Sequence, residues 1–203
     1  MAYFPFFVDI ENRPALIAGG GTVALRKVRK LLPYGPRLTV VAPEITAELT
    51  GLPGVTLLSR PFQPEDLVGM DFVIAATADR ELNREIASLC QARHIPVNAV
   101  DDREFCSFLF PCLIQRGTLS VGISTGGASP TAAIYLKDRL NELIPEGLED
   151  ILDYLESLRP RLKAALPSEG QRAAAFSALF QGCLEQNRPL TPAEEQSLLT
   201  QYF

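Results

Sequence analysis

The chain has 203 residues, 47% of them hydrophobic, which is enough to bury a sizeable core in one domain with an appendage or in two small domains. Its net charge of −5 argues against general nucleic-acid binding, which needs a basic surface, but it is compatible with a local basic pocket for an acidic small molecule. No apolar run approaches the length that spans a bilayer, and the N-terminal residues lack the basic start and cleavage pattern of a signal peptide, so we expect no membrane association.

The first predicted elements are two strands and a helix. Residues 4–10 are apolar and aromatic and predict a strand, which a turn connects to a short buried strand over residues 16–18. Three consecutive glycines end this second strand. A helical pattern follows at once and ends at residues 33–36, and its apolar face consists of Val23, Leu25, Val28, Leu31 and Leu32.

The glycines fit the dinucleotide-binding fingerprint as Gly19-x-Gly21-x-x-Ala24. Gly19 permits the tight turn from strand to helix, Gly21 lets a pyrophosphate approach the backbone, and Ala24 is small enough for the helix to pack on the strand. Thr22 and Val23 begin the helix, whose free N–H groups and positive end would face the phosphates of the cofactor. The motif alone is unspecific, because a glycine-rich turn without a ligand has the same residues.

A strand predicted over residues 37–42 completes a β-α-β unit. Pro43 and Glu44 follow this strand, where an acidic residue often holds the ribose hydroxyls, so we predict both as adenosine-ribose contacts. A solvated loop acid is the alternative for Glu44. No arginine comes directly after the strand to receive a 2′-phosphate, which favours NAD over NADP.

The alternation of strands and helices continues to residue 102. Strands are predicted over residues 55–58, 71–77 and 95–100, and helices over residues 45–51, 62–67 and 79–94. This pattern predicts a doubly wound parallel sheet, in which ligands bind outside the carboxyl ends of the strands. Thr77 and Asn98 are expected at that edge with the glycine motif. The small residues before Thr77 would let a nucleotide lie against the strand, or they only pack against a helix.

The pattern changes after residue 102. Residues 107–114 and 119–124 predict two antiparallel strands outside the parallel sheet. A loop then leads to Ser129-Pro130, a favourable N-cap and first helical residue, and to a helix over residues 131–143. The rest of the chain is helical by pattern, with predicted breaks at Pro160, residues 167–168 and residues 187–189.

These elements predict an α/β fold in three parts. A Rossmann-like NAD-binding domain is expected over residues 1–112, a small α+β segment over residues 113–146, and a C-terminal helical domain over residues 147–203.

Cysteine and histidine usage argues against a metal site. The cysteines have no C-x-x-C spacing and no histidine cluster beside them, so no residue is assigned to a metal. Scattered thiols without a secretory signal fit a reducing cytoplasm, where we expect each thiol to be a small buried hydrophobe. The residues concerned are Cys90, Cys106, Cys112, Cys183 and His94, the last expected to be structural or at the surface.

Five short motifs occur in one order up to about residue 145. They are Gly19-Gly20-Gly21-x-Val23-Ala24-x-Arg26-Lys27, Ala75-Ala76-Thr77-x-Asp79, Val97-Asn98-Ala99-Val100-Asp101-Asp102, Ser107-Phe108-x-x-Pro111 and Ser124-Thr125-Gly126-Gly127-x-Ser129-Pro130. The glycine motif is unspecific, whereas the last three motifs together are specific. With them the chain resembles the precorrin-2 dehydrogenase and sirohydrochlorin ferrochelatase family, a module of siroheme synthase. No methyltransferase pattern accompanies the motifs, so the resemblance is to the stand-alone form.

The resemblance implies an enzyme that oxidises precorrin-2, a carboxylate-rich tetrapyrrole, to sirohydrochlorin by hydride transfer to NAD. Some members of the family then insert Fe²⁺ to give siroheme, so Fe²⁺ is a further candidate substrate, and the siroheme and cobalamin branches are not distinguished. The family also implies a homodimer in which the segment after the nucleotide domain is exchanged between the two copies, with residues 113–146 as the dimerisation and substrate segment.

Asp101 matches the family's catalytic aspartate and is expected beside the nicotinamide, where a carboxylate can take the proton that departs as the hydride leaves. A turn-capping role is the alternative, and Asp102 is expected to be solvated. Thr125 stands where the family has a serine near the tetrapyrrole. The residues expected to contact the substrate are Asn98, Ser124, Thr125, Gly126 and Gly127, the loop residues by wrapping carboxylates with backbone N–H groups.

A carboxylate-rich substrate needs cations, and the candidates are Arg103, Arg116, Lys137 and Arg139, with surface solvation as the alternative for each. Ile134 stands where the family often carries an arginine. Two other functions stay open: a dinucleotide-sensing module without turnover, and a dehydrogenase of another acidic metabolite. Asp101 together with the 124–130 segment favours the enzyme, because a sensor needs no second ligand edge.

Overall fold

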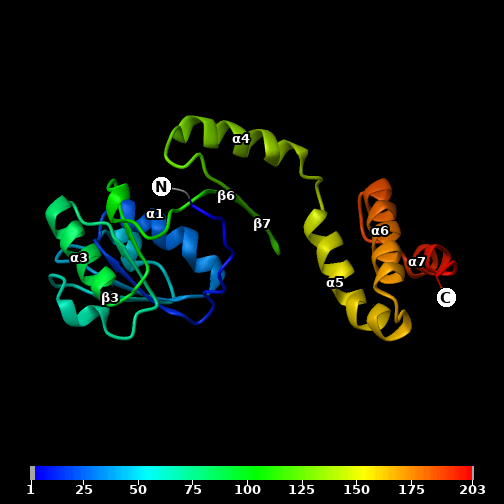
Figure 1. Ribbon diagram of the computed structural model, residues 1–203, viewed down its shortest axis with the longest axis horizontal. Helices are drawn as coiled ribbons and strands as arrows, with labels where there is room; N and C mark the ends of the chain where they lie inside the picture. Colours follow the sequence, from blue (N-terminus) through cyan, green and yellow to red (C-terminus); the bar gives the residue numbers. More distant parts are fainter. Residues whose placement is uncertain (1–2, 203) are drawn as a thin grey trace. The chain divides into compact units, whose positions relative to one another are not determined.

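The computed structural model describes residues 3–202 and consists of two compact units, Met1–Phe110 and Pro111–Phe203 (Figure 1). The division of the second unit into a 113–146 segment and a 147–203 domain stays a prediction. Among the described residues, no helix has both the length and the apolar character needed to cross a bilayer.

The first unit is built on a parallel sheet of five strands in the order β3-β2-β1-β4-β5. The strands are β1 Pro14–Ala18, β2 Arg37–Val41, β3 Val55–Leu58, β4 Phe72–Ala75 and β5 Val97–Ala99. The central strands β1 and β4 are buried on both faces, as their continuous apolar sequences require. The expected doubly wound α/β fold is therefore confirmed.

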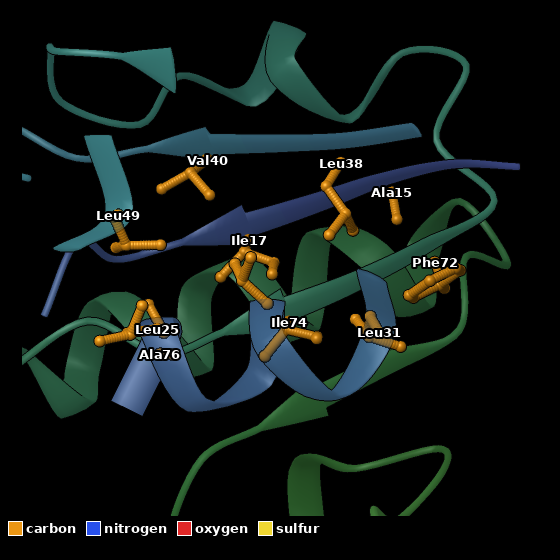
Figure 2. Packing of buried hydrophobic residues seen from close by; sticks show 12 residues of the cluster. Ala15, Ile17, Leu25, Leu31, Leu38, Val40, Leu49, Phe72, Ile74 and Ala76 are labelled. Atoms are coloured by element: carbon orange, nitrogen blue, oxygen red, sulfur yellow. The ribbon is translucent and has the colours of Figure 1, made fainter. Parts of the chain in front are cut away.

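Two helices cover opposite faces of this sheet: α1 (Thr22–Leu31) packs on one face and α3 (Arg80–Ala92) on the other. Successive residues of β1 pack alternately into the hydrophobic cores on the two faces of the sheet, because side chains alternate along a strand. Ile17 belongs to one buried cluster with Leu25 and Leu31 of α1 and with Ile74 of β4 (Figure 2). Each fully buried side chain of this size stabilises the fold by about 1.5–3 kcal/mol, so the core holds α1 firmly against β1.

Short elements complete the unit. They are the helix α2 (Ala47–Thr50) and the 3₁₀ helices η1 (Leu32–Tyr34), η2 (Pro64–Leu67) and η3 (Arg103–Phe105). Gly35 ends η1 in the left-handed region at φ 69°, which explains why the predicted helix stops there.

The described part of the second unit contains the predicted hairpin and four helices, but the first strand of the hairpin starts at Cys112 and not at residue 107. The hairpin joins β6 (Cys112–Arg116) to β7 (Leu119–Ile123), antiparallel, with Cys112 opposite Ile123. The helix α4 (Pro130–Leu143) begins at Ser129, whose Oγ accepts the N–H of Ala132 at 3.1 Å. A separate core joins α5 (Leu148–Ala165), α6 (Glu169–Gln186) and α7 (Pro192–Leu199).

Two sequence predictions about elements are wrong. The 4–10 segment forms no strand, and Phe4, Phe6 and Phe7 are 75–78% exposed, because its apolar side chains have no sheet neighbour in the described structure. Pro160 does not break a helix but lies inside α5. Leu158 and Leu162, on either side of it, are both in the helical core, so packing outweighs the helix-breaking tendency of the proline.

Candidate functional site

The segments that follow β1, β2, β4 and β5 meet at one edge of the sheet. The N–H of Gly19 donates to the carbonyl of Val41 at 2.9 Å, and the N–H of Ala76 donates to Ala18 at 2.7 Å. The N–H of Val100 donates to Ala75 at 2.9 Å. These bonds hold the predicted cofactor segments and the start of the Asp101 turn on one rigid edge, where ligands of open α/β sheets bind.

The three glycines after β1 have different surroundings. Gly19 has φ +127°, and a Cβ on it would lie 2.2 Å from the carbonyl oxygen of Ala76. A Cβ on Gly20 would lie 2.1 Å from the carbonyl oxygen of Glu44. Apart from Gly21 itself and its two chain neighbours, no described atom lies within 4 Å of the place that a Gly21 Cβ would take. The fold thus requires the first two glycines, whereas the third leaves an open approach to the backbone.

Gly20 was not predicted as a required residue, because the fingerprint leaves its position free. The run of three glycines was the available signal.

The N-terminus of α1 opens at Gly21. Gly21 is the N-cap and, within the described structure, no side chain caps the helix. Thr22 is exposed and Val23 is half-buried, and the first turn contains no acidic residue. The first N–H groups of a helix lack partners inside it, so this end offers donors and a positive dipole to an anion. The geometry therefore fits the pyrophosphate of a dinucleotide.

Pro43 and Glu44 are exposed after β2. The backbone carbonyl of Glu44 lies against Gly20, so the residue directly flanks the glycine turn. Among residues 3–202, no hydrogen bond or ion pair occupies the Glu44 carboxylate, which leaves it available to ribose hydroxyls or to solvent. The two interpretations of Glu44 both remain compatible with this geometry.

Thr77 is held by Asn83 of α3. The N–H of Thr77 donates to Asn83 Oδ1 at 3.0 Å, and Asn83 Nδ2 donates to the carbonyl of Thr77 at 3.1 Å. The Thr77 hydroxyl also donates to Asn83 Oδ1, at 2.8 Å. Because its polar groups already have these partners, Thr77 would meet a bound cofactor through van der Waals contact. Sequence reasoning missed Asn83; a polar residue on the apolar face of a predicted helix was the signal.

Asp101 and Asp102 have opposite environments. Asp101 is exposed, with φ +60° in the left-handed region, and no described residue donates a hydrogen bond to its carboxylate. Asp102 is only 6% exposed, and its Oδ2 accepts from Arg84 Nε at 2.7 Å and from Arg80 Nε at 3.3 Å. The expectation of a solvated Asp102 is therefore wrong, because the η3 turn folds it onto the arginines of α3.

The Arg84 hydrogen bond, with the charges of Arg84 and Arg80, holds the pKa of Asp102 below its ordinary value. Asp102 is therefore a negative charge already neutralised within the protein.

Asn98 on β5 is buried, and its amide has partners inside the first unit. Its Oδ1 accepts from Lys27 Nζ at 3.3 Å, and its Nδ2 donates to the carbonyl of Phe108 at 3.1 Å. Burial, followed by the charge of Lys30, lowers the pKa of Lys27 to about 8. Asn98 thus connects β5 with α1 and with the segment after η3, while its contact with a substrate stays a prediction.

The predicted substrate loop belongs to the second unit. Thr125 Oγ1 accepts the N–H of Ser129 at 3.1 Å and donates to the Ser129 carbonyl at 3.0 Å, which closes the loop on itself. Ser124 Oγ accepts the N–H of Gly126 at 3.1 Å. Gly126 and Gly127 have positive φ values of 62° and 85°, which glycine adopts readily. The loop is therefore locally ordered by its own hydroxyls, and its contact with a substrate stays a prediction.

The four candidate cations make local contacts. Arg103 lies over the Tyr3 ring, with 5.4 Å from Cζ to the centroid, and Arg116 Nη2 donates to Asn141 Oδ1 at 3.1 Å. Lys137 pairs with Asp138, and Arg139 pairs with Glu142. Arg80 and Arg84, which sequence reasoning did not single out, lie closer in sequence to the predicted cofactor edge.

All four cysteines are free thiols, three of them buried and Cys112 half-buried. His94 is exposed, with φ +57°. In the part of the chain that the structure describes, no three histidine, cysteine or acidic residues come together in a group that could hold a metal ion.

Comparisons with known proteins agree with the fold described above. Siroheme synthase of Pseudomonas aeruginosa (strain PAO1) is 40% identical over 208 residues, which cover 100% of this chain and 44% of that protein. Siroheme synthase of Neisseria meningitidis serogroup C is 36% identical over 202 residues, 97% of this chain and 42% of that protein. The chain thus spans less than half the length of these relatives. The matches confirm the resemblance to siroheme synthases.

A solved structure shares the fold. SirC, precorrin-2 dehydrogenase, superposes with a TM-score of 0.75 at 24% identity, and the match covers 98% of both chains. Residues 6–112, which include the glycine turn and the whole parallel sheet, match the family described as putative NAD(P)-binding. The chain belongs to this putative NAD(P)-binding family.

Proposed function

We propose that the protein oxidises precorrin-2 to sirohydrochlorin with NAD as hydride acceptor. The observation that carries the proposal is one sheet edge with an open glycine approach at Gly21 and an unpaired, outward carboxylate at Asp101. Siroheme synthases are relatives over nearly the whole chain, and the solved neighbour is described as a precorrin-2 dehydrogenase, which favours this substrate over other acidic metabolites.

The residues of this chain fit a dinucleotide. The N–H groups at the start of α1 would receive the pyrophosphate, since the Gly21 position leaves room for it and no acidic side chain lies in the first turn. Glu44 would accept hydrogen bonds from the ribose hydroxyls. NAD, when bound, supplies the hydride acceptor.

Asp101 would act as the proton acceptor. As a hydride leaves a C–H bond of precorrin-2 for the nicotinamide, one proton must also leave the macrocycle, and the Asp101 carboxylate can take it if the substrate lies within hydrogen-bond reach. The neighbouring Asp102 is already paired with two arginines, so it is not available for this step. Ser124, Thr125, Gly126 and Gly127 are the proposed direct substrate contacts, whereas Asn98, whose amide has partners inside the protein, would act on the substrate indirectly.

The test is an anaerobic assay with precorrin-2 and NAD, in which NADH absorbance is followed. Asp101→Asn keeps the size of the side chain but removes the base, so we expect NADH production to fall by about 100-fold or more, within the range for general-base catalysis, with unchanged NAD binding. Glu104→Gln, an exposed acid in η3, is the matched control and should retain turnover. Unaltered turnover of Asp101→Asn would remove Asp101 from the mechanism.

Fe²⁺ insertion is a further proposal for the same site. Asp101 would accept the pyrrole N–H protons that the macrocycle loses when it takes the metal, so the ion is a substrate and needs no resident ligand cluster. The same assay repeated with and without Fe²⁺ tests it: a product spectrum that does not depend on the metal would confine the protein to oxidation.

Preference for NAD over NADP is proposed from Glu44. An exposed carboxylate after β2 would repel a 2′-phosphate, and the first residues after that strand, Ala42 and Pro43, offer no cation. Glu44→Ser should therefore lower the ratio of NAD affinity to NADP affinity, with both affinities measured by isothermal titration. An unchanged ratio would assign the preference to other residues.

A homodimer is proposed from α4. This helix exposes large apolar side chains in the single chain, which a monomer would leave in water: Ile134, Tyr135, Leu136, Leu140 and Leu143. We propose a second copy of the chain as the cover. Leu136→Lys should shift sedimentation velocity profiles toward the monomer, whereas Thr131→Ala on the same helix should not. A wild-type monomer at micromolar concentration would contradict the proposal.

We also propose a cytoplasmic location, because the four free thiols suit a reducing compartment. Cell fractionation with an antibody against the chain tests this.

A further inference from the structure

Lys27 is a half-buried cation whose charge the described structure leaves without a counter-charge. Its Nζ donates to Asn98 Oδ1 at 3.3 Å and lies 3.8 Å from the centroid of the Phe110 ring. Within residues 3–202, no carboxylate oxygen comes within 4.0 Å of this ammonium. An amide oxygen and an aromatic face stabilise a cation only in part, and buried charges in proteins are normally paired.

The environment of Lys27 is costly for the charged form. Burial lowers the pKa of Lys27 to about 8, and the charges of Lys30 and Arg26 on the same helix act in the same direction. Asp101 and the Cys106 thiol act in the opposite direction but do not restore the ordinary value. Methionine would fill the same space without this penalty. The position therefore maintains a positive charge at the expense of stability, as expected of a binding residue.

The residues around Lys27 also fix the position of its ammonium group. Asn98 Nδ2 donates to the carbonyl of Phe108, so its Oδ1 is turned toward Lys27. Asn98 lies on β5, three residues before Asp101. An ammonium has three donors, and only one is used by Asn98. The remaining donors of the Lys27 ammonium are therefore held beside β5, on the side of the cofactor edge that carries Asp101.

We propose that Lys27 binds a carboxylate group of the substrate and that Asn98 holds the ammonium in place for it. The inference rests on the proposed tetrapyrrole substrate and assigns to it a carboxylate subsite on α1, next to the dinucleotide. The substrate carboxylate would be the counter-charge that the chain itself lacks at this position. Asn98 would then act on the substrate through Lys27, with its own amide engaged inside the protein.

The experiment titrates the full-length protein, saturated with NAD, with the metal-free product sirohydrochlorin and follows the pigment's absorbance. Lys27→Met should weaken binding by about 10- to 100-fold, the range for one charge-assisted hydrogen bond. Lys27→Arg keeps the charge and should retain most of the affinity. Lys30→Met, an exposed lysine on the same helix, is the matched control and should bind as the wild type does.

Two further measurements separate a binding role from a structural one. Lys27→Met should keep its affinity for NAD and should melt at the same or a higher temperature than the wild type, whereas loss of a structural lysine would lower the melting temperature. Wild-type affinity should be constant below about pH 8 and fall above it, as the ammonium loses its proton. This fall of affinity with pH should be absent in Lys27→Met. The variant keeps Arg26, Lys30, Asp101 and Cys106, so a fall that persists would come from one of these groups.

The outcomes are distinct. Equal sirohydrochlorin affinity of wild type and Lys27→Met, or a pH slope that persists in the variant, would overturn the subsite while the dehydrogenase stands. A wild-type protein that neither binds sirohydrochlorin nor reduces NAD with precorrin-2 would overturn the proposed function and the subsite with it. If Lys27→Met does not fold, Lys27→Gln replaces it in the same comparison.

Discussion

Gly21→Ala should separate cofactor binding from folding. Gly21 has φ −92° and ψ −167°, which an L residue adopts without strain, and no described atom beyond its chain neighbours lies within 4 Å of the added Cβ. Alanine is a poorer N-cap than glycine, so we expect a loss of about 1 kcal/mol or less in the free energy of unfolding. The new methyl group would, however, occupy the space through which a pyrophosphate reaches the N–H groups of α1.

The effect on binding follows from the contacts that would be lost. Displacing the phosphates from one or two charge-assisted hydrogen bonds removes about 3 kcal/mol, which is roughly a 100-fold loss of NAD affinity. Gly20→Ala should behave differently, since its Cβ would lie 2.1 Å from the Glu44 carbonyl oxygen and 2.9 Å from Ile45 Cα. Both neighbours are backbone atoms, so that variant should lose about 1–3 kcal/mol of stability or more.

Isothermal titration with NAD and urea unfolding provide the two readouts. Gly51→Ala is the matched control, because Gly51 has φ −82° and a Cβ there would find its nearest neighbour at an ordinary 3.7 Å. The expected result is a stable Gly21→Ala that binds NAD weakly. Wild-type NAD affinity in Gly21→Ala would refute the assignment of this helix terminus to the pyrophosphate.

Three further predictions concern the supporting structure. Leu162→Ala, in the core of α5 to α7, should lower the free energy of unfolding by about 2–5 kcal/mol, and a smaller loss in urea titrations would mean that the helical core collapses around the cavity. Asn83→Ala removes the clamp on Thr77 and should destabilise the fold by about 1–3 kcal/mol while weakening NAD binding; unaffected NAD titrations would contradict its positioning role. Because the folded-state pKa of Asp102 is depressed, its contribution to stability is present above its unfolded pKa of about 4 and is lost as the pH falls through the lower folded-state pKa. Asp102→Asn should therefore show a shallower acid dependence of unfolding than the wild type, and equal slopes would exclude Asp102 as a contributor.

The sheet and its helices were predictable because their patterns are local. Buried parallel strands are continuous apolar runs, helices repeat every 3.6 residues, and glycine spacing marks the turn between them. The failures came where tertiary contacts decide. Pro160 is tolerated because Leu158 and Leu162 are packed on either side of it, and the 4–10 segment lacks a neighbouring strand although its residues favour one.

The position of the candidate site at one edge of the sheet could be predicted from the sequence, but the side-chain hydrogen bonds that support it could not. Chain order alone places Gly19, Glu44 and Asp101 at the carboxyl ends of parallel strands. The partners that fix this edge are distant in sequence: Asn83 reaches Thr77 from α3, and Arg84 reaches Asp102 from the same helix. Such pairs depend on how α3 is rotated against the sheet, which no single-sequence pattern specifies.

The contrast between Asp101 and Asp102 favours one of the two roles that the sequence left open for Asp101. A turn-capping aspartate accepts a backbone N–H, yet no described group donates to the Asp101 carboxylate. A non-glycine residue at φ +60° costs about 1–2 kcal/mol and persists only where neighbours hold it. Here Val100 is bonded to Ala75 and Asp102 is paired with Arg84, so the backbone on both sides is fixed. The fixed backbone therefore carries a carboxylate that no described group occupies, which a proton acceptor needs and a cap does not.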